Sequence, residues 1–247
     1  MTLLVTVGMF ILIIFIHELS HLLMGYWLKS PPAIFSVGFG KPWCAIQIKQ
    51  TEFRFAPILL GGYVSWHRDL KRSMDVLKEL SAWKQILIYF AGCAGNAITA
   101  FVIMVYMAFQ ILQTDIITAT RVSYMILSEY IAMLFYYLSA FVRPEISTVE
   151  SLGGMGTIYI AVREAMLTGH EELIFLFVIL SLTIAILNLI PIPPLDGGHI
   201  AQTVIEYIIG RRFSYRANVF LMYLGVALIL IIFATATYSD IRRLFFM

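Results

Sequence analysis

Charge is scarce in this sequence. Only 13% of its 247 residues are Asp, Glu, Lys or Arg, whereas 60% are hydrophobic. This composition excludes an ordinary soluble domain and indicates a membrane protein. A net charge of +2 and the lack of a basic run argue against nucleic-acid binding. Two cysteines, Cys44 and Cys93, are too few for a disulfide framework or a thiolate metal site.

Four stretches are long and apolar enough to cross the roughly 30 Å of membrane hydrocarbon. The first has neither the basic start nor the small-residue cleavage site of a signal peptide, so we expect it to be retained. A fifth apolar stretch, residues 124–142, carries a narrow polar stripe that includes Glu129, and we expect an interfacial or non-spanning helix there. The four expected spans are residues 3–27, 86–112, 173–192 and 219–238.

Three titratable side chains interrupt the first apolar stretch. His17 and His21 are four residues apart, so on a helix they share a face and can offer two imidazole nitrogens to one ion. Glu18 lies about 100° round the helix, close enough to reach a water on that ion. This HExxH pattern is that of zinc hydrolases, in which the carboxylate acts as general base. The alternative, histidines that only pack between helices, is disfavoured because a carboxylate at membrane depth costs about 2.5 to 3.5 kcal/mol.

The third apolar stretch ends in a proline-rich break. Three prolines between Pro191 and Pro194 cannot continue a helix, so the chain breaks at membrane depth. The break presents Asp196 on a glycine-supported turn, which makes it the best candidate for a third zinc ligand and leaves a fourth position for water. The alternative role of Asp196 is to cap a helix that restarts near Ile200. We expect His199 to be interfacial.

Residues 34–66 have the pattern of a β-hairpin. Apolar and polar side chains alternate on both sides of a polar turn at residues 50–52. A hairpin this apolar is expected to re-enter the bilayer and to offer an edge strand to an extended peptide. The alternative is a hairpin that only plugs the helix bundle. The residues expected to bind substrate here are Phe53, Arg54, Phe55, Gly61 and Gly62.

Basic residues orient the helices. Nine of the 17 Lys and Arg lie in residues 29–84 and none precedes the first apolar stretch. The positive-inside rule therefore places the N-terminus outside and this segment in the cytoplasm. The first helix then runs inward and carries its histidines in the inner half of the bilayer. Asp196 reaches that level only if the third stretch also runs inward, which excludes a full crossing by residues 124–142.

Residues 17–21 and 188–198 together resemble the metal motifs of the site-2 protease family of intramembrane zinc metalloproteases. The resemblance is closest to the bacterial branch that cleaves membrane-anchored anti-sigma factors, and residues 38–40 and 60–64 are similar to that branch's membrane-reentrant β-loop. It implies one Zn²⁺, a base that activates water, and an amide that holds the substrate backbone or the developing oxyanion. The implied ligands are His17, His21 and Asp196, the base is Glu18 and the amide is Asn188.

The sequence departs from that family in three places. Proline is usual at the positions of Cys93 and Gly154. The bacterial branch also carries one or more PDZ domains between its second and third spans, but residues 113–172 are too short and too apolar for one. The resemblance thus implies a short form without a PDZ domain, in which any size filter on substrates is absent or supplied in trans.

The sequence therefore predicts an all-α polytopic membrane protein, with a four-helix transmembrane core, a membrane-reentrant β-hairpin and one extra helix. Residues 1–247 would form a single metalloprotease domain of the bacterial inner membrane, with the active site toward the cytoplasm. The predicted reaction is hydrolysis of a peptide bond within or near the transmembrane segment of a single-span protein. The expected partners are that substrate and the lipid bilayer, without nucleic acid. The alternatives are a catalytically silent homologue that binds membrane helices, and a metal-binding or metal-transporting membrane protein.

Overall fold

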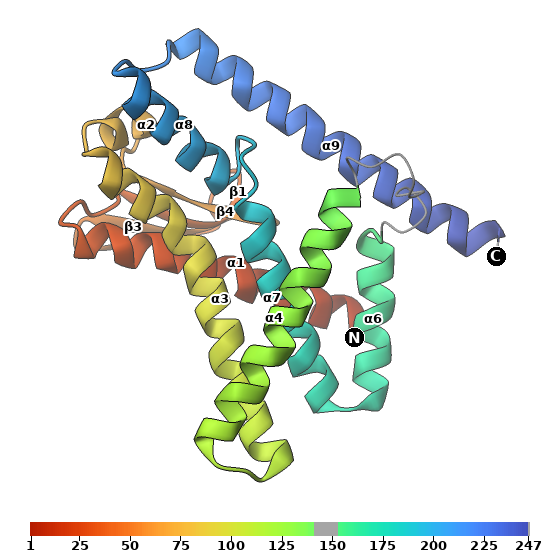
Figure 1. Ribbon diagram of the computed structural model, residues 1–247. Coiled ribbons are helices and arrows are strands. Elements are labelled where there is room, and N and C mark those ends of the chain that lie inside the picture. Colours follow the sequence, from red (N-terminus) through yellow and green to blue (C-terminus); the bar gives the residue numbers. More distant parts are fainter. Residues whose placement is uncertain (141–152, 247) are drawn as a thin grey trace. The chain divides into compact units, whose positions relative to one another are not determined.

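The computed structural model describes residues 1–140 and 153–246 and is mostly helical, with one small mixed sheet (Figure 1). The chain forms two compact units. One contains residues 7–97 and 184–225, and the other contains residues 1–6, 98–183 and 226–247. We call the first the site unit and the second the peripheral unit, and we describe each by itself.

Four helices of the described residues are long and apolar enough to cross a membrane. Each contains or closely matches one of the four predicted spans, because long apolar runs have few alternatives to a buried helix. The third span ends earlier than predicted, at Asn188, since the prolines that follow cannot continue the helix. The four helices are α1 (Thr2–Trp27), α3 (Ala82–Leu112), α7 (His170–Asn188) and α9 (Tyr215–Phe246).

The site unit contains a sheet of four strands rather than a hairpin alone. The predicted hairpin is present as β2 and β3, but β1 pairs in parallel with β3 and antiparallel with β4, which gives the order β2-β3-β1-β4. The mostly helical fold is thus confirmed, the β structure is larger than the predicted hairpin, and the entry of the sheet into the bilayer stays a prediction. The strands are β1 (Ile34–Phe39), β2 (Cys44–Ile48), β3 (Thr51–Phe55) and β4 (Ile58–Ser65).

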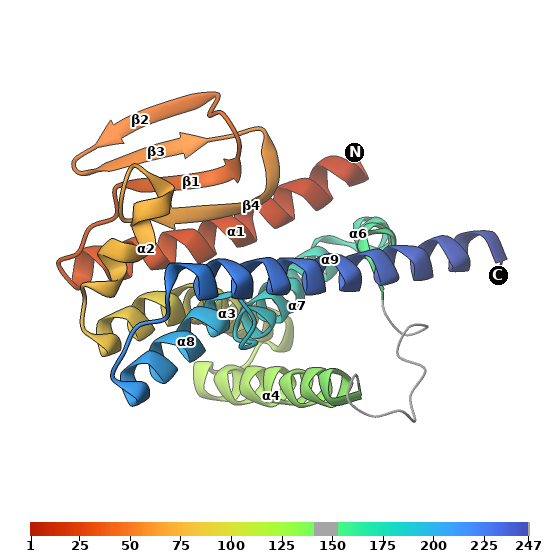
Figure 2. The same ribbon diagram turned by 90° about the horizontal axis from the view of Figure 1, so that it is seen from above.

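The sheet packs along α1 (Figure 2). Leu22 of α1 is buried with Phe35 and Val37 of β1, and this cluster joins helix and sheet. A second cluster, around Trp66, holds α2 (Leu70–Lys78) and the start of α3 against the end of α1. The Trp66 indole also donates a hydrogen bond of 2.8 Å to the Ser30 carbonyl oxygen. These contacts fix the sheet beside the helix that carries the two histidines.

The peripheral unit contains α4 (Ile116–Ala140) and α6 (Met155–Thr168). Asp240 of α9 caps the start of α6, where it accepts hydrogen bonds from the amides of Gly154, Gly156 and Thr157. The helix predicted for residues 124–142 is part of α4, which begins earlier and is not among the four candidate spans. Residues 141 and 142 lie outside the described residues, and the depth of α4 in the bilayer stays a prediction.

Candidate metal centre

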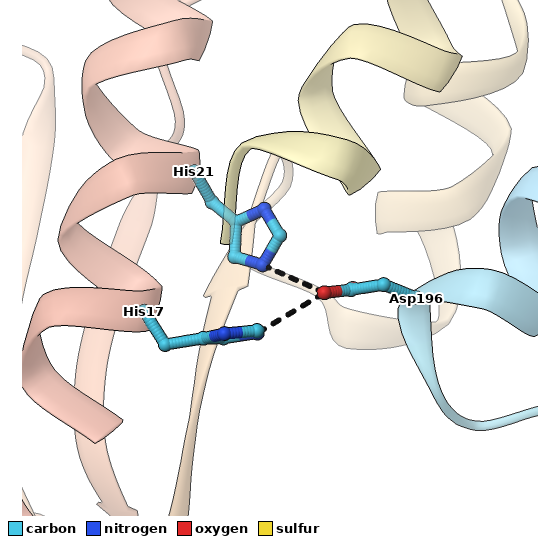
Figure 3. Close-up of side chains that lie close together, drawn as sticks. All are labelled: His17, His21 and Asp196. Atoms are coloured by element: carbon cyan, nitrogen blue, oxygen red, sulfur yellow. Dashed lines mark ion pairs between the residues drawn. The ribbon is translucent and has the colours of Figure 1, made fainter. Parts of the chain in front are cut away.

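Three side chains from distant parts of the sequence meet in the site unit. His17 and His21 lie on one face of α1, as their spacing predicts, and point at the carboxylate of Asp196 (Figure 3). Asp196 is the first residue of α8 (Asp196–Ile209). Its Oδ2 lies 3.0 Å from His17 Nε2 and 3.4 Å from His21 Nε2. Each of the three residues thus offers one ligand atom, and these three atoms all lie within 4.8 Å of one another.

The donor set and the two distances to Asp196 Oδ2 suit a tetrahedral zinc site. Two ligands at 2.0 to 2.1 Å from a tetrahedral ion lie about 3.3 Å apart, close to the distances from Asp196 Oδ2 to the two imidazoles. Two histidines and one carboxylate are also a donor set of catalytic zinc sites, which keep a fourth position for water. Three such groups brought together in a membrane protein are costly without a shared ion.

The orientation of His21 is set by a partner on α3. Its Nδ1 lies 2.7 Å from the backbone carbonyl oxygen of Ile88. Because a carbonyl only accepts hydrogen bonds, Nδ1 donates to Ile88, and Nε2 is the ring nitrogen that faces Asp196. Metal-binding histidines commonly have such a partner, which fixes both the ring and the tautomer.

Two glycines allow the proline turn to present Asp196. A Cβ on Gly197 would lie 2.1 Å from the Leu189 carbonyl oxygen, and a Cβ on Gly198 would lie 2.3 Å from the Pro193 nitrogen. Only glycine permits α8 to start this close to the preceding turn. The alternative that Asp196 serves merely as a helix cap is wrong, because the N-cap residue is Leu195 and Asp196 already lies within the helix.

Helix α3 forms a wall directly against the imidazoles. A Cβ on Gly92 would lie 2.4 Å from His21 Nε2 and 2.6 Å from His17 Nε2. The next residue, Cys93, is buried with its sulfur 3.7 Å from Asp196 Oδ2. The sequence pattern suggests only helix packing for Gly92. Its position beside His17 and His21 becomes clear only from how α1 and α3 pack together. Gly95 does fit packing, because a Cβ there would overlap Ser20.

A cavity of about 590 Å³ opens beside the three ligands. Glu18 lines it and is only 9% exposed. A Cβ on Gly62 would lie 2.8 Å from Glu18 Cγ, so the glycine leaves room for this side chain. Asn188, at the end of α7, and Gly61, on β4, also line it. The structure thus brings together the predicted base, the three predicted ligands, and three of the predicted substrate-binding residues.

His199 lines this cavity, and its predicted place at the membrane interface stays a prediction. Its ring stacks on Tyr89, with centroids 4.9 Å apart and planes at 18°. Its Nδ1 is buried and has no hydrogen-bond partner among the described residues. The spacing of three residues places His199 on the same face of α8 as Asp196, but this signal depends on α8 beginning at Asp196, which the sequence alone does not show.

The remaining predicted residues, Phe53, Arg54 and Phe55, do not line the metal cavity. They border a separate groove of about 510 Å³ beside Ile11, Leu12 and Phe15 of α1. The prediction that they form a free edge is wrong, because β3 lies inside the sheet between β2 and β1. Arg54 is also bound to Glu52 through two hydrogen bonds, of 2.9 and 3.1 Å. The edge strand β4 lines the metal cavity with residues Gly61 to Val64, and Phe39 at the end of β1 also lines it.

Comparison with known proteins gives a family and several relatives. The model of Peptidase family M50 matches residues 5–232. A Campylobacter jejuni protein is 25% identical over 343 aligned residues, which cover 98% of this chain and 93% of that protein. A Borreliella burgdorferi protein is 38% identical over 108 residues, which cover 39% of this chain and 25% of that protein. The names of both begin "Putative zinc metalloprotease".

The relatives differ in how much of their length this chain spans. It spans a quarter of the Borreliella protein and 24% of a similar Lactococcus lactis protein that is 36% identical over 107 residues. The alignment with the Campylobacter protein is 343 residues long, whereas this chain has 247, so that protein has additional segments. The sequence similarity therefore extends to proteins that are longer than this chain.

Proposed function

The chain belongs to Peptidase family M50, the site-2 protease family, and we propose that it is an intramembrane zinc metalloprotease. Its proposed reaction is hydrolysis of a peptide bond within or near the transmembrane segment of a single-span membrane protein. The observation that carries this proposal is the convergence of His17, His21 and Asp196 beside the buried Glu18, in a chain with four candidate membrane spans.

The residues of the cavity have complementary roles in this reaction. Zn²⁺, when bound by His17, His21 and Asp196, supplies a Lewis acid and lowers the pKa of a bound water to about 7. Glu18 takes the proton of the attacking water and delivers it to the leaving amine. The amide of Asn188 donates a hydrogen bond to the substrate carbonyl, where negative charge develops. Each of these groups lines the same cavity.

We propose that the substrate backbone binds along strand β4. It pairs with β1 on one side only, and residues Gly61 to Val64 line the metal cavity. An unwound substrate segment can extend the sheet by adding to this edge, where main-chain hydrogen bonds hold it without regard to sequence. Because Gly61 and Gly62 carry no side chains, an extended peptide can approach Glu18 closely.

The proposed setting is a bacterial inner membrane. The cluster of basic residues between positions 29 and 84 supports an N-terminus outside and an active site toward the cytoplasm. The proposed partners are a transmembrane protein or peptide substrate and the lipid bilayer. With this orientation, peptide bonds near the cytoplasmic end of a substrate helix lie level with the metal centre.

The test is cleavage of a single-span substrate by purified protein in liposomes. Glu18→Gln keeps the shape of the side chain but removes the base, so we expect cleavage to fall about 10²- to 10⁴-fold while the zinc content stays unchanged. Glu129→Gln, on the exposed face of α4, is the matched control and should cleave normally. Cleavage that survives in Glu18→Gln, or an inactive wild type that moves zinc across the membrane, would reject the proposal.

A further inference from the structure

A second polar cavity of the site unit lies at the start of α3 and has a volume of about 430 Å³. It is formed by the end of α2, the first turn of α3 and the end of α8. Its charged lining residues are the three cations Lys78, Arg211 and Arg212 and the acidic Glu206. None of these residues belongs to the metal cavity.

The acidic residue of this cavity is already neutralised. Glu206 Oε1 lies 2.8 Å from Lys78 Nζ and also accepts hydrogen bonds from Gln202 and from the Phe213 amide. Burial raises the pKa of the Glu206 carboxyl, but these hydrogen bonds outweigh it and hold the pKa below its usual value. Glu206 therefore stays ionised and pairs with Lys78, so neither contributes net charge to the cavity.

The two arginines supply the remaining charge. Gly210 ends α8 in a left-handed conformation with φ of 72°, and the chain turns there to place Arg211 and Arg212 at the cavity. Arg212 donates a hydrogen bond to the backbone carbonyl of Lys78, which orients its guanidinium without cancelling its charge. Arg211 makes no ion pair within residues 1–140 and 153–246. The cavity therefore carries an excess of about two positive charges.

The surroundings place this cavity at the level of lipid headgroups. It lies at Ala82, where the candidate membrane span α3 begins. Large aromatic side chains near it are exposed, including Trp83 at 55%, Tyr207 at 76% and Tyr215 at 70%. Exposed Trp and Tyr beside basic residues are typical of the boundary between membrane and water. A soluble anion gains nothing from these aromatic surfaces, whereas a lipid covers them.

We propose that this cavity binds the phosphate headgroup of an anionic phospholipid. Arginine is suited to this role because its planar guanidinium can donate two parallel hydrogen bonds to one phosphate. Arg211 and Arg212 would hold the phosphate, while the acyl chains lie along the exposed apolar surface of α3 and α8. The site is distinct from the metal centre and does not depend on catalysis.

The experiment is native mass spectrometry of the full chain in detergent, titrated with phosphatidylglycerol or phosphatidylcholine. We expect tighter binding of phosphatidylglycerol, and a loss of about fivefold in that preference for each arginine changed to glutamine, the factor expected for one cation beside an anionic headgroup. The double variant Lys84→Gln with Arg216→Gln is the control. It removes two positive charges nearby, as changing both arginines does, from residues that do not line the cavity, and should keep the preference.

Three outcomes would overturn the proposal. The first is equal binding of both lipids by the wild type. The second is an equal loss in the control, which would indicate diffuse surface charge. The third is displacement of phosphatidylglycerol by millimolar inorganic phosphate, which would show that a soluble anion is the ligand. Because Arg212 also holds Lys78, the single variant Arg211→Gln tests the site without disturbing that contact.

Discussion

The site unit contains two cavities of similar size that border the same helix and the same sheet, and they differ in what they bury. The metal cavity, of about 590 Å³, buries His17, Glu18 and His21. The groove beside β3, of about 510 Å³, is lined by apolar residues of α1 and by aromatic rings, and its one charged residue, Arg54, is already paired. In this fold, buried polar groups identify the reactive face of α1, and aromatic residues on a strand do not.

The largest effect on the metal cavity is expected when one of the metal ligands is removed. Asp196→Ala should reduce zinc from about one ion per molecule to almost none, because two histidines alone hold zinc weakly. Cleavage should fall at least about 10³-fold, since the Lewis acid is lost with the ion. Metal analysis by mass spectrometry and the liposome cleavage assay measure the two effects.

The control for this variant is Asp115→Ala. Asp115 caps α4 by accepting hydrogen bonds from the Ile117 and Thr118 amides, so its loss should lower stability slightly and cost no zinc. An Asp196→Ala protein that keeps its zinc would show that the two histidines bind the ion with some other third ligand.

A smaller effect is expected at β4. A Cβ on Gly62 would lie 2.7 Å from the Ser36 carbonyl oxygen and 2.8 Å from Glu18 Cγ, so Gly62→Ala must displace the strand or the base. We expect cleavage to fall about 10- to 100-fold with full zinc content, because the three ligands are not touched. Ile46→Ala, at an exposed position of β2, is the matched control and should cleave normally. Loss of zinc together with activity would instead show that β4 supports the ligands.

The smallest effect on catalysis is expected in the groove. Phe53 packs against Phe35, with ring centroids 5.2 Å apart, and belongs to the cluster that joins sheet and helix. Phe53→Ala should therefore lower stability by about 2 kcal/mol, measured by thermal unfolding, while zinc content and cleavage per folded molecule stay unchanged. A loss of cleavage without a loss of stability or zinc would show that Phe53 binds substrate, and the two cavities would then not differ in function.

The parts of the site that sequence could predict are those set by local spacing or by a rare residue pattern. His17, Glu18 and His21 follow from helical periodicity, and Asp196 follows from a proline break that few other roles explain. The edge of the sheet could not be predicted, because the parallel pairing of β1 with β3 joins residues far apart in sequence. The position of Gly92 beside the imidazoles could not be predicted for a related reason, since that contact depends on how two helices meet.

The metal ligands come from opposite ends of the chain, and this has a consequence for biogenesis. A chain that is still being made offers the two histidines of α1 well before Asp196, because α8 lies more than 150 residues after α1. High affinity for zinc therefore appears only after assembly, and the ion then stabilises the assembled form. If the proposed function holds, hydrolysis cannot begin while the chain is being inserted, since the metal centre is complete only when the fold is complete.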